Sequence, residues 1–252
     1  GKYIRDHFEQ YGLVPLDGHY YQHFKCENGK VGRNVIGMVP SAIPSDEYVI
    51  ISAHYDHIGA LNGFVYNGAD DNASGVTALM NLAEMFGSMR KAKMGPDKNI
   101  IFVAFDAKEM SMAGSRHFVK NLSIPKGKIT CAINMDQIGS TLEPVHEGIK
   151  DYLIILGENT LKKEDRGKIG LCNRFYNIHL DIDYTFYSSE AFTTLYYKLS
   201  DQVAFQEAEI PALLLTSGFH SHTYKISDDI DLISYPTLKK RTVLVFYFVM
   251  ML

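Results

Sequence analysis

The sequence has few cysteines, no excess of basic residues and no apolar stretch long enough to cross a bilayer. The three cysteines, Cys26, Cys131 and Cys172, show no paired spacing, so they predict neither a disulfide framework nor a cysteine-based zinc motif. The net charge of -4 argues against nucleic acid as a partner, because phosphate binding needs a concentrated basic face. The apolar tail at 243–252 has about half the length of a membrane span, so no transmembrane segment is expected.

The length and composition are those of an ordinary globular protein. At 252 residues, with 46% hydrophobic and 21% charged residues, the chain is large enough for one well-buried core. No internal repeat and no linker-like stretch divides it. We therefore expect a single domain over residues 1–252.

Strand-like and helix-like segments alternate along the chain. Near-continuous apolar runs, which are typical of buried strands, lie at 48–53, 99–105, 129–135, 152–156 and 211–216, and weaker strand signals lie at 20–24 and 34–39. Helical periodicity covers 2–11, 73–89, 111–121 and 237–252, with Asp71 or Asn72 as a candidate cap of the second helix. This order predicts an α/β fold, a three-layer sandwich around a mixed, mostly parallel central sheet.

Acids and imidazoles follow directly after the apolar runs. The run at 48–53 is followed by His54, Asp56 and His57, the run at 99–105 by an Asp-Ala-Lys-Glu segment, and the run at 129–135 by Asp136. The last run leads to His220 and a second histidine two residues later. Since open α/β sheets place their ligand crevice outside the carboxyl ends of the strands, these side chains are expected to converge there.

Several carboxylates and two imidazoles in one crevice need a cation among them. Without one they would repel each other or stay protonated. Nitrogen and oxygen ligands together suit zinc, and acid-rich sites commonly hold two metal ions bridged by one carboxylate. The pattern therefore predicts a metal centre at the strand ends, in preference to scattered helix caps and core histidines.

The chain resembles the di-zinc aminopeptidases of the bacterial leucyl aminopeptidase type, peptidase family 28. The resemblance spans the region from residue 48 to about residue 235 and is carried by the order of seven segments. They are SAHYDH at 52–57, GADDNASGV at 68–76, FVAF at 102–105, GSR at 114–116, INMDQIG at 133–139, SD at 200–201 and IPA at 210–212. The resemblance implies a zinc-exopeptidase fold of the phosphorylase/hydrolase-like kind.

The same resemblance implies the roles of individual residues. Two zinc ions are expected, with Asp71 bridging them. The other ligands would be His54 and Asp136 for one ion, and Glu109 and His222 for the other. Asp56 would orient the imidazole of the first ligand histidine, His57 has no role in the pattern, and His220 is the alternative to His222.

One position departs from the family pattern at the centre of the chemistry. The glutamate that normally precedes the second-metal glutamate, and acts as general base, is Lys108 here. An ammonium cannot accept a proton, although two neighbouring cations would favour the neutral amine. Losing a general base typically lowers the rate by about 10²–10⁴. The ammonium would also repel the metal ions, so one zinc or none are the alternatives to two.

Three functions remain open on this basis. The first is a zinc-dependent aminopeptidase that removes N-terminal residues from peptides by metal-activated water. The second is a catalytically weak or inactive peptidase-fold protein that binds peptide or glycan ends. The third is a glutaminyl-cyclase-like acyltransferase, which requires an acid where Lys108 stands.

The substrate pocket and the cellular location are only weakly indicated. The aromatic-rich segment 173–199 is a candidate part of the substrate pocket, although such clusters more often belong to the core or rim. By family resemblance we expect a secreted, periplasmic or outer-surface protein whose signal segment is absent from this sequence. The oligomeric state is not indicated.

Overall fold

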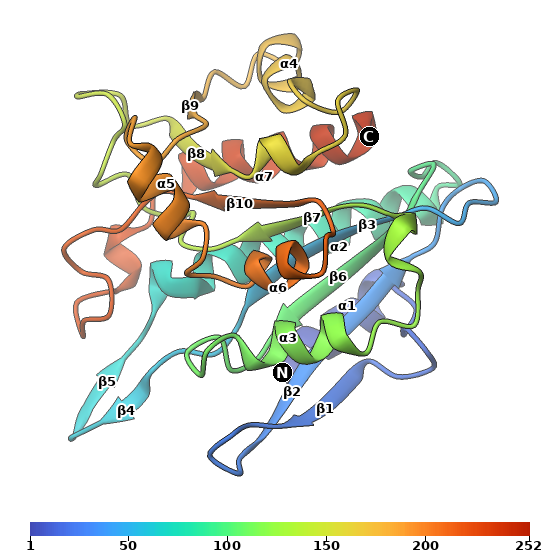
Figure 1. Cartoon of the computed structure of the whole chain (residues 1–252), viewed down its shortest axis with the longest axis horizontal. Helices are drawn as coiled ribbons and strands as arrows, with labels where there is room; N and C mark the ends of the chain where they lie inside the picture. Colours follow the sequence, from blue (N-terminus) through green and yellow to red (C-terminus); the bar gives the residue numbers. More distant parts are fainter.

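The apolar runs form one eight-stranded sheet in the computed structural model, which describes residues 1–252 (Figure 1). In spatial order the strands are β1 (Tyr21–Lys25), β2 (Val31–Val39), β6 (Asn99–Phe105), β3 (Tyr48–His54), β7 (Ile129–Met135), β10 (Ala212–Thr216), β8 (Tyr152–Leu156) and β9 (Asp181–Asp183). Strands β6, β3, β7 and β10 are parallel neighbours, while β1–β2, β2–β6 and β10–β8 pair antiparallel. The sheet is mixed and mostly parallel, as predicted.

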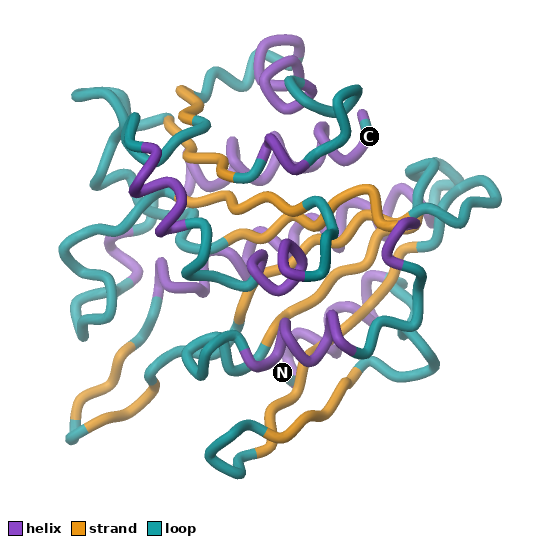
Figure 2. Tube along the Cα trace, viewed as in Figure 1, coloured by secondary structure: helices purple, strands orange, loops and turns teal.

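Helices cover both faces of this sheet (Figures 1 and 2). One face carries α1 (Lys2–Tyr11), α2 (Gly75–Lys91) and α7 (Tyr235–Met251), with α4 (Lys168–Phe175) packed against α7. The other face carries α3 (Ala113–Lys120) and α6 (Gln202–Glu207). The predicted three-layer α/β architecture is therefore confirmed.

The central strands are apolar on both faces because both faces are buried. In β3, Val49 and Ile51 belong to the larger core under α1, α2 and α7, whereas Ile50 belongs to the smaller core under α3 and α6. In β6, Phe102 and Val103 divide between the two cores in the same way. A strand with a solvent-facing side would alternate with polar residues.

The parallel strands bring their carboxyl ends to one edge of the sheet. The chain runs from β3 to β6 on one side and then returns to β7 on the other side of β3. Such a reversal of strand order opens a crevice above the carboxyl ends of the strands. His54 is the last residue of β3, and Asp136 directly follows β7.

Short elements without strong periodicity were not predicted. They are the hairpin β4 (Gly59–Leu61) and β5 (Phe64–Tyr66), the irregular turn η1 (Ala69–Ser74), helices α4, α5 (Glu190–Tyr196) and α6, strand β9 and the single turns η2 (Lys126–Lys128), η3 (Glu158–Thr160) and η4 (Ile230–Leu232). The hairpin projects from the body of the molecule (Figure 1). Between the two cap candidates for α2, it is Asn72 whose side-chain oxygen accepts the N–H of Gly75, at 3.1 Å.

Two further features concern membranes and cysteines. None of the helices combines the length and the apolarity that crossing a bilayer requires. Cys26, Cys131 and Cys172 are free buried thiols. Burial raises the pKa of the Cys131 thiol well above its usual range, so this side chain is an uncharged core residue.

Replacing Phe102 by alanine should strongly destabilise the fold. The Phe102 ring is fully buried, and its centroid lies 6.3 Å from those of Phe8 and Phe86. We expect Phe102→Ala to lower the free energy of unfolding by about 3–5 kcal/mol in urea denaturation. Phe175→Ala is the matched control because Phe175 is 71% exposed, and it should change stability by less than about 0.5 kcal/mol. Equal losses in both variants would contradict this assignment of the core.

Candidate metal centre

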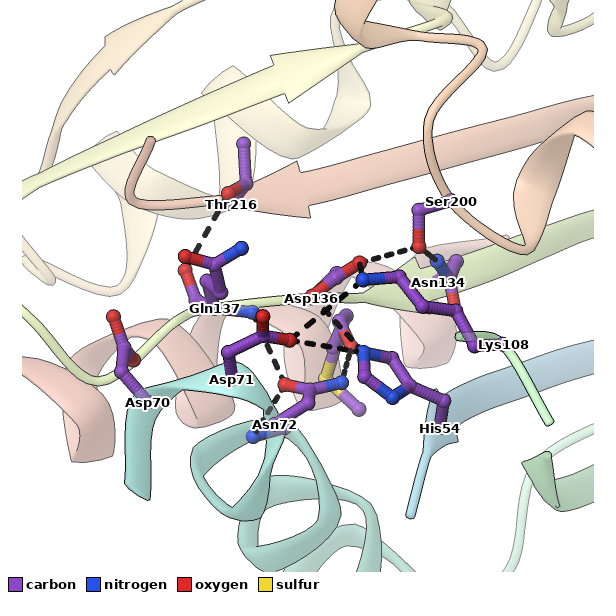
Figure 3. A network of polar contacts seen from close by, with 12 residues as sticks. His54, Asp70, Asp71, Asn72, Lys108, Asn134, Asp136, Gln137, Ser200 and Thr216 are labelled. Carbon is purple, nitrogen blue, oxygen red and sulfur yellow. Dashed lines mark hydrogen bonds and ion pairs between the residues drawn. The ribbon is translucent and has the colours of Figure 1, made fainter. Parts of the chain in front are cut away.

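Three predicted ligands meet in a buried group at the carboxyl ends of the strands (Figure 3). The Nε2 atom of His54 lies 3.3 Å from a carboxylate oxygen of Asp71 and 3.3 Å from one of Asp136. The three residues come from β3, from the turn η1 and from the end of β7. Their ligand atoms lie within 4.8 Å of one another, which suits a single metal ion with nitrogen and oxygen ligands.

Asp56 fixes the orientation of His54. The Nδ1 atom of His54 lies 3.1 Å from the backbone oxygen of Asp56 and 3.6 Å from its carboxylate, which leaves Nε2 facing the acids. The same carboxylate accepts the backbone N–H groups of Lys108, at 2.9 Å, and Glu109, at 3.0 Å. Asp56 therefore joins the end of β3 to the segment after β6, in the orienting position expected from the sequence.

The imidazole of His54 lies in a strongly negative environment. Burial disfavours the charged ring, but the carboxylates of Asp136, Asp56 and Asp71 outweigh it and raise the pKa of His54 well above its usual value. For Asp136, burial is outweighed by Lys108 and His54, and its pKa is lowered. Ser200 adds a hydrogen bond to this carboxylate, at 2.5 Å.

Asp71 is held by its backbone and not by its side chain. The backbone N–H groups of Asp70 and Asp71 donate to the carboxylate of Asp228, at 2.9 Å and 3.0 Å. The side chain of Asp71 is fully buried, yet neither of its oxygens accepts a hydrogen bond. Its positive neighbours, His54 at 3.3 Å and Lys108 at 3.7 Å, leave both oxygens without a hydrogen bond, which fits a cation-binding role.

The side chain of Lys108 reaches into the same group of acids (Figure 3). Its Nζ atom lies 3.1 Å from Glu109 and 3.7 Å from both Asp71 and Asp136. It also donates to the hydroxyl of Tyr224, at 3.2 Å. Burial favours the neutral amine, but the carboxylates of Asp136, Asp71 and Glu109 outweigh it and raise the pKa of Lys108.

A second group of potential ligands shares Asp71 with the first. Its other members are His57 and Glu109, and all ligand atoms of this group again lie within 4.8 Å of one another. Both ring nitrogens of His57 are buried without a hydrogen-bond partner, and the ring stacks on Tyr224 with 6.5 Å between centroids. Sequence reasoning gave His57 no role, although its place three residues after His54 at a strand end was a usable signal.

The structure does not bring His222 into either group. Its Nδ1 atom instead lies 2.9 Å from the hydroxyl of Ser227. The alternative ligand, His220, is buried against Asp70, with Nε2 at 3.1 Å from the carboxylate. The loop after β10 instead places Tyr224, two residues after His222, against the ammonium of Lys108. The assignment of His222 as a zinc ligand therefore stays a prediction from the resemblance.

A small cavity adjoins the acids on the side of α5. It has a volume of about 20 Å³, which is room for about one water molecule. Its walls include Lys108, Asp136 and apolar side chains, among them three from the aromatic-rich segment at 173–199. These are Phe186, Tyr196 and Leu199. Part of that segment therefore lies beside the candidate metal centre.

Acids and an imidazole at the switch point of an α/β sheet make this a candidate site for a divalent metal ion. The sequence profile of Peptidase family M28 matches residues 34–249, and the chain belongs to this family.

Two kinds of relatives agree with this assignment. Aminopeptidase YwaD of Bacillus subtilis is 31% identical over 125 residues, which cover 49% of this chain and 25% of that protein. The chain thus spans about a quarter of that curated relative's length, and 13% of the glutamate carboxypeptidase 2 homologue from Caenorhabditis briggsae.

The solved structures agree in fold. A leucine aminopeptidase precursor from Bacteroides thetaiotaomicron superposes with a TM-score of 0.73 at 19% identity, covering 99% of this chain and 87% of that one. Glutaminyl cyclase from Porphyromonas gingivalis superposes with a TM-score of 0.70 at 17% identity and the same coverage. The fold alone therefore does not distinguish a peptidase from a cyclase.

Asp201 is a buried acid without a partner near this centre. It is fully buried at the start of α6, and neither carboxylate oxygen accepts a hydrogen bond. Burial, only partly offset by His54 and by the hydroxyl of Ser115, raises the pKa of Asp201 to about 7 in the metal-free chain. Between about pH 4 and pH 7 the folded state therefore holds a proton that the unfolded state has lost.

Asp201→Asn should make the protein more stable, increasingly so as the pH rises. Because the folded-state pKa is the higher one, ionisation of Asp201 removes stability as the pH rises from about 4 to about 7, and an amide avoids this loss. We expect the gain in the free energy of unfolding to grow across this window towards about 4 kcal/mol. Denaturant unfolding at several pH values measures it, with the exposed Glu147→Gln as control. A gain that is independent of pH would contradict the assignment.

Proposed function

We propose that the chain is a zinc-binding peptidase domain that removes residues from the amino end of peptides. The observation that carries this proposal is the buried group of His54, Asp71 and Asp136, whose ligand atoms lie within 4.8 Å of one another. Family membership supports peptide-bond hydrolysis, and the orphaned carboxylate of Asp71 supports a bound cation. Zinc is the ion that fits one imidazole and two carboxylates best.

Three residues would bind the ion, and a fourth orients one of these ligands. His54 and Asp136 would hold zinc from two neighbouring strands, with Asp71 between them, and Asp56 keeps the imidazole aimed at the acids. When bound, zinc would act as a Lewis acid on the scissile carbonyl and lower the pKa of a bound water. The protein supplies a dry, rigid frame, because the three ligands are at most 5% exposed.

Charge favours the amino end of a peptide over the carboxyl end. Asp71, Glu109 and Asp136 meet here, and only one ammonium, that of Lys108, faces all three. With zinc held by His54, Asp71 and Asp136, Glu109 is the acid that remains outside the metal ligands, and it attracts the α-ammonium group of a substrate and repels an α-carboxylate. Phe186, Tyr196 and Leu199, which line the adjoining cavity, favour an uncharged substrate side chain.

Hydrolysis by this site is proposed to be slow. Lys108 stands where a general base is required, and as an ammonium it cannot accept a proton from water. Its neighbour Glu109 already accepts a hydrogen bond from that ammonium, at 3.1 Å. A missing general base typically lowers a rate by about 10²–10⁴.

The position of Lys108 also favours a second candidate function. With the ammonium within 4 Å of three acids, the same site suits a protein that binds peptide ends and no longer cleaves them. Glutaminyl cyclisation is not proposed, because it requires an acid where Lys108 stands. Export from the cell remains a prediction from the family resemblance.

Hydrolysis of alanyl and leucyl p-nitroanilides with zinc present tests the proposal. We expect slow but measurable turnover by the wild-type chain, and at least a 100-fold loss in His54→Ala and Asp136→Asn. Lys108→Glu should accelerate turnover by about 10²–10⁴, because it restores a carboxylate at the base position. His146→Ala is the matched control, since its imidazole is exposed and contacts only Asp181.

The outcomes separate the two candidate functions. A wild-type chain that binds zinc without hydrolysing either amide, together with an active Lys108→Glu variant, would favour the peptide-binding function. Inactivity of both, with zinc bound, would contradict the peptidase proposal. Loss of activity in His146→Ala equal to that in His54→Ala would show that the effect is not specific to the site.

A further inference from the structure

The two groups of potential ligands differ in what already occupies them. In the group of His54, Asp71 and Asp136, the imidazole Nε2 lies 3.3 Å from each carboxylate, and the Lys108 ammonium approaches these two carboxylates only to 3.7 Å. In the group of His57, Asp71 and Glu109, the Lys108 ammonium lies against two of the three members, at 3.1 Å from Glu109 and 3.7 Å from Asp71. The ammonium therefore makes its shortest contact in the second group, where it donates a hydrogen bond to Glu109.

The ammonium is held there from several directions. The backbone N–H of Lys108 donates to the carboxylate of Asp56, at 2.9 Å, which fixes the start of the side chain. The Nζ atom donates to the hydroxyl of Tyr224, at 3.2 Å. The ring of Tyr224 also lies beneath it, with 5.5 Å between Nζ and the ring centroid. With only 5% of Lys108 exposed, water offers the ammonium no competing environment. Displacing it would strand a buried charge, which costs several kcal/mol.

The charges of Lys108 and of the three carboxylates around it are balanced by one divalent cation and not by two. Three carboxylates and the Lys108 ammonium leave a net charge of minus two, which a single divalent ion neutralises. A second divalent ion would make the buried site positive and would lie beside the ammonium. A glutamate in place of Lys108 would instead leave four carboxylates, which two divalent ions neutralise.

We propose that the Lys108 ammonium takes the place of a second metal ion, so that the chain binds one divalent cation, at His54, Asp71 and Asp136. This rests on the zinc-binding part of the proposed function and adds the number and position of the ions. Lys108 is then a built-in cation that neutralises Asp71, Glu109 and Asp136 in common with the single metal.

Counting metal ions tests this directly. The metal-free chain is equilibrated with buffered free zinc and analysed by elemental mass spectrometry, and we expect about one zinc per chain. Lys108→Glu should bind about two. Lys240→Glu is the matched control, because it carries the same change of charge in an ion pair with Asp151, and it should still bind one. Circular dichroism confirms that each variant is folded.

A second measurement does not depend on any variant. Titrating the metal-free wild-type chain with Co²⁺ should saturate the visible absorption of the bound ion at one equivalent. Loss of this absorption in Asp136→Asn, with folding retained, would support the position assigned to the ion.

Each result bears on the proposal in a defined way. Two ions in the wild-type chain would overturn the single-metal inference, whatever the activity. One ion in a chain that hydrolyses no peptide amide would leave the inference standing and contradict the peptidase function. No bound ion would overturn both the inference and the zinc-binding part of the proposed function.

Discussion

The structure around the strand ends depends on positive charge that offsets the mutual repulsion of clustered carboxylates. Asp71, Glu109 and Asp136 meet in a space from which water is largely excluded, and they can stay ionised there only with positive charge among them. The chain supplies one such charge itself, as the ammonium of Lys108. The negative charge that remains is what makes a divalent metal ion a fitting occupant.

The scaffold makes this crowding possible. Four adjacent parallel strands end at one edge of the sheet, so residues far apart in the sequence meet there without long loops. A further layer of hydrogen bonds fixes them: Asp56 for the imidazole, Asp228 for the turn that carries Asp71, and Ser200 for Asp136. The cost of gathering the acids is met by a core of apolar strands buried on both faces.

Membership of Peptidase family M28 defines the fold and the general chemistry of the chain, and Lys108 is the residue at which the site departs from the family pattern. The same architecture superposes on an aminopeptidase precursor and on a glutaminyl cyclase, so activity resides in the site and not in the sheet. In this chain, an ammonium, that of Lys108, lies among Asp71, Glu109 and Asp136, at the position where the family resemblance implies a carboxylate. The activity of the chain therefore depends on Lys108 as well as on the family fold.

The sequence by itself determined the layers of the fold and three of the candidate metal ligands. Runs such as 99–105 are apolar at every position because both faces are buried, so period and composition suffice to identify them, and His54, Asp71 and Asp136 follow from their places at strand ends and in a motif. Only the tertiary structure decided that His57 joins Asp71 and Glu109, that His222 turns towards Ser227, and that Tyr224 supports Lys108. The physical reason is that loops have no periodicity. The direction of a loop side chain is set by packing and by charges from distant segments, which the local sequence does not encode.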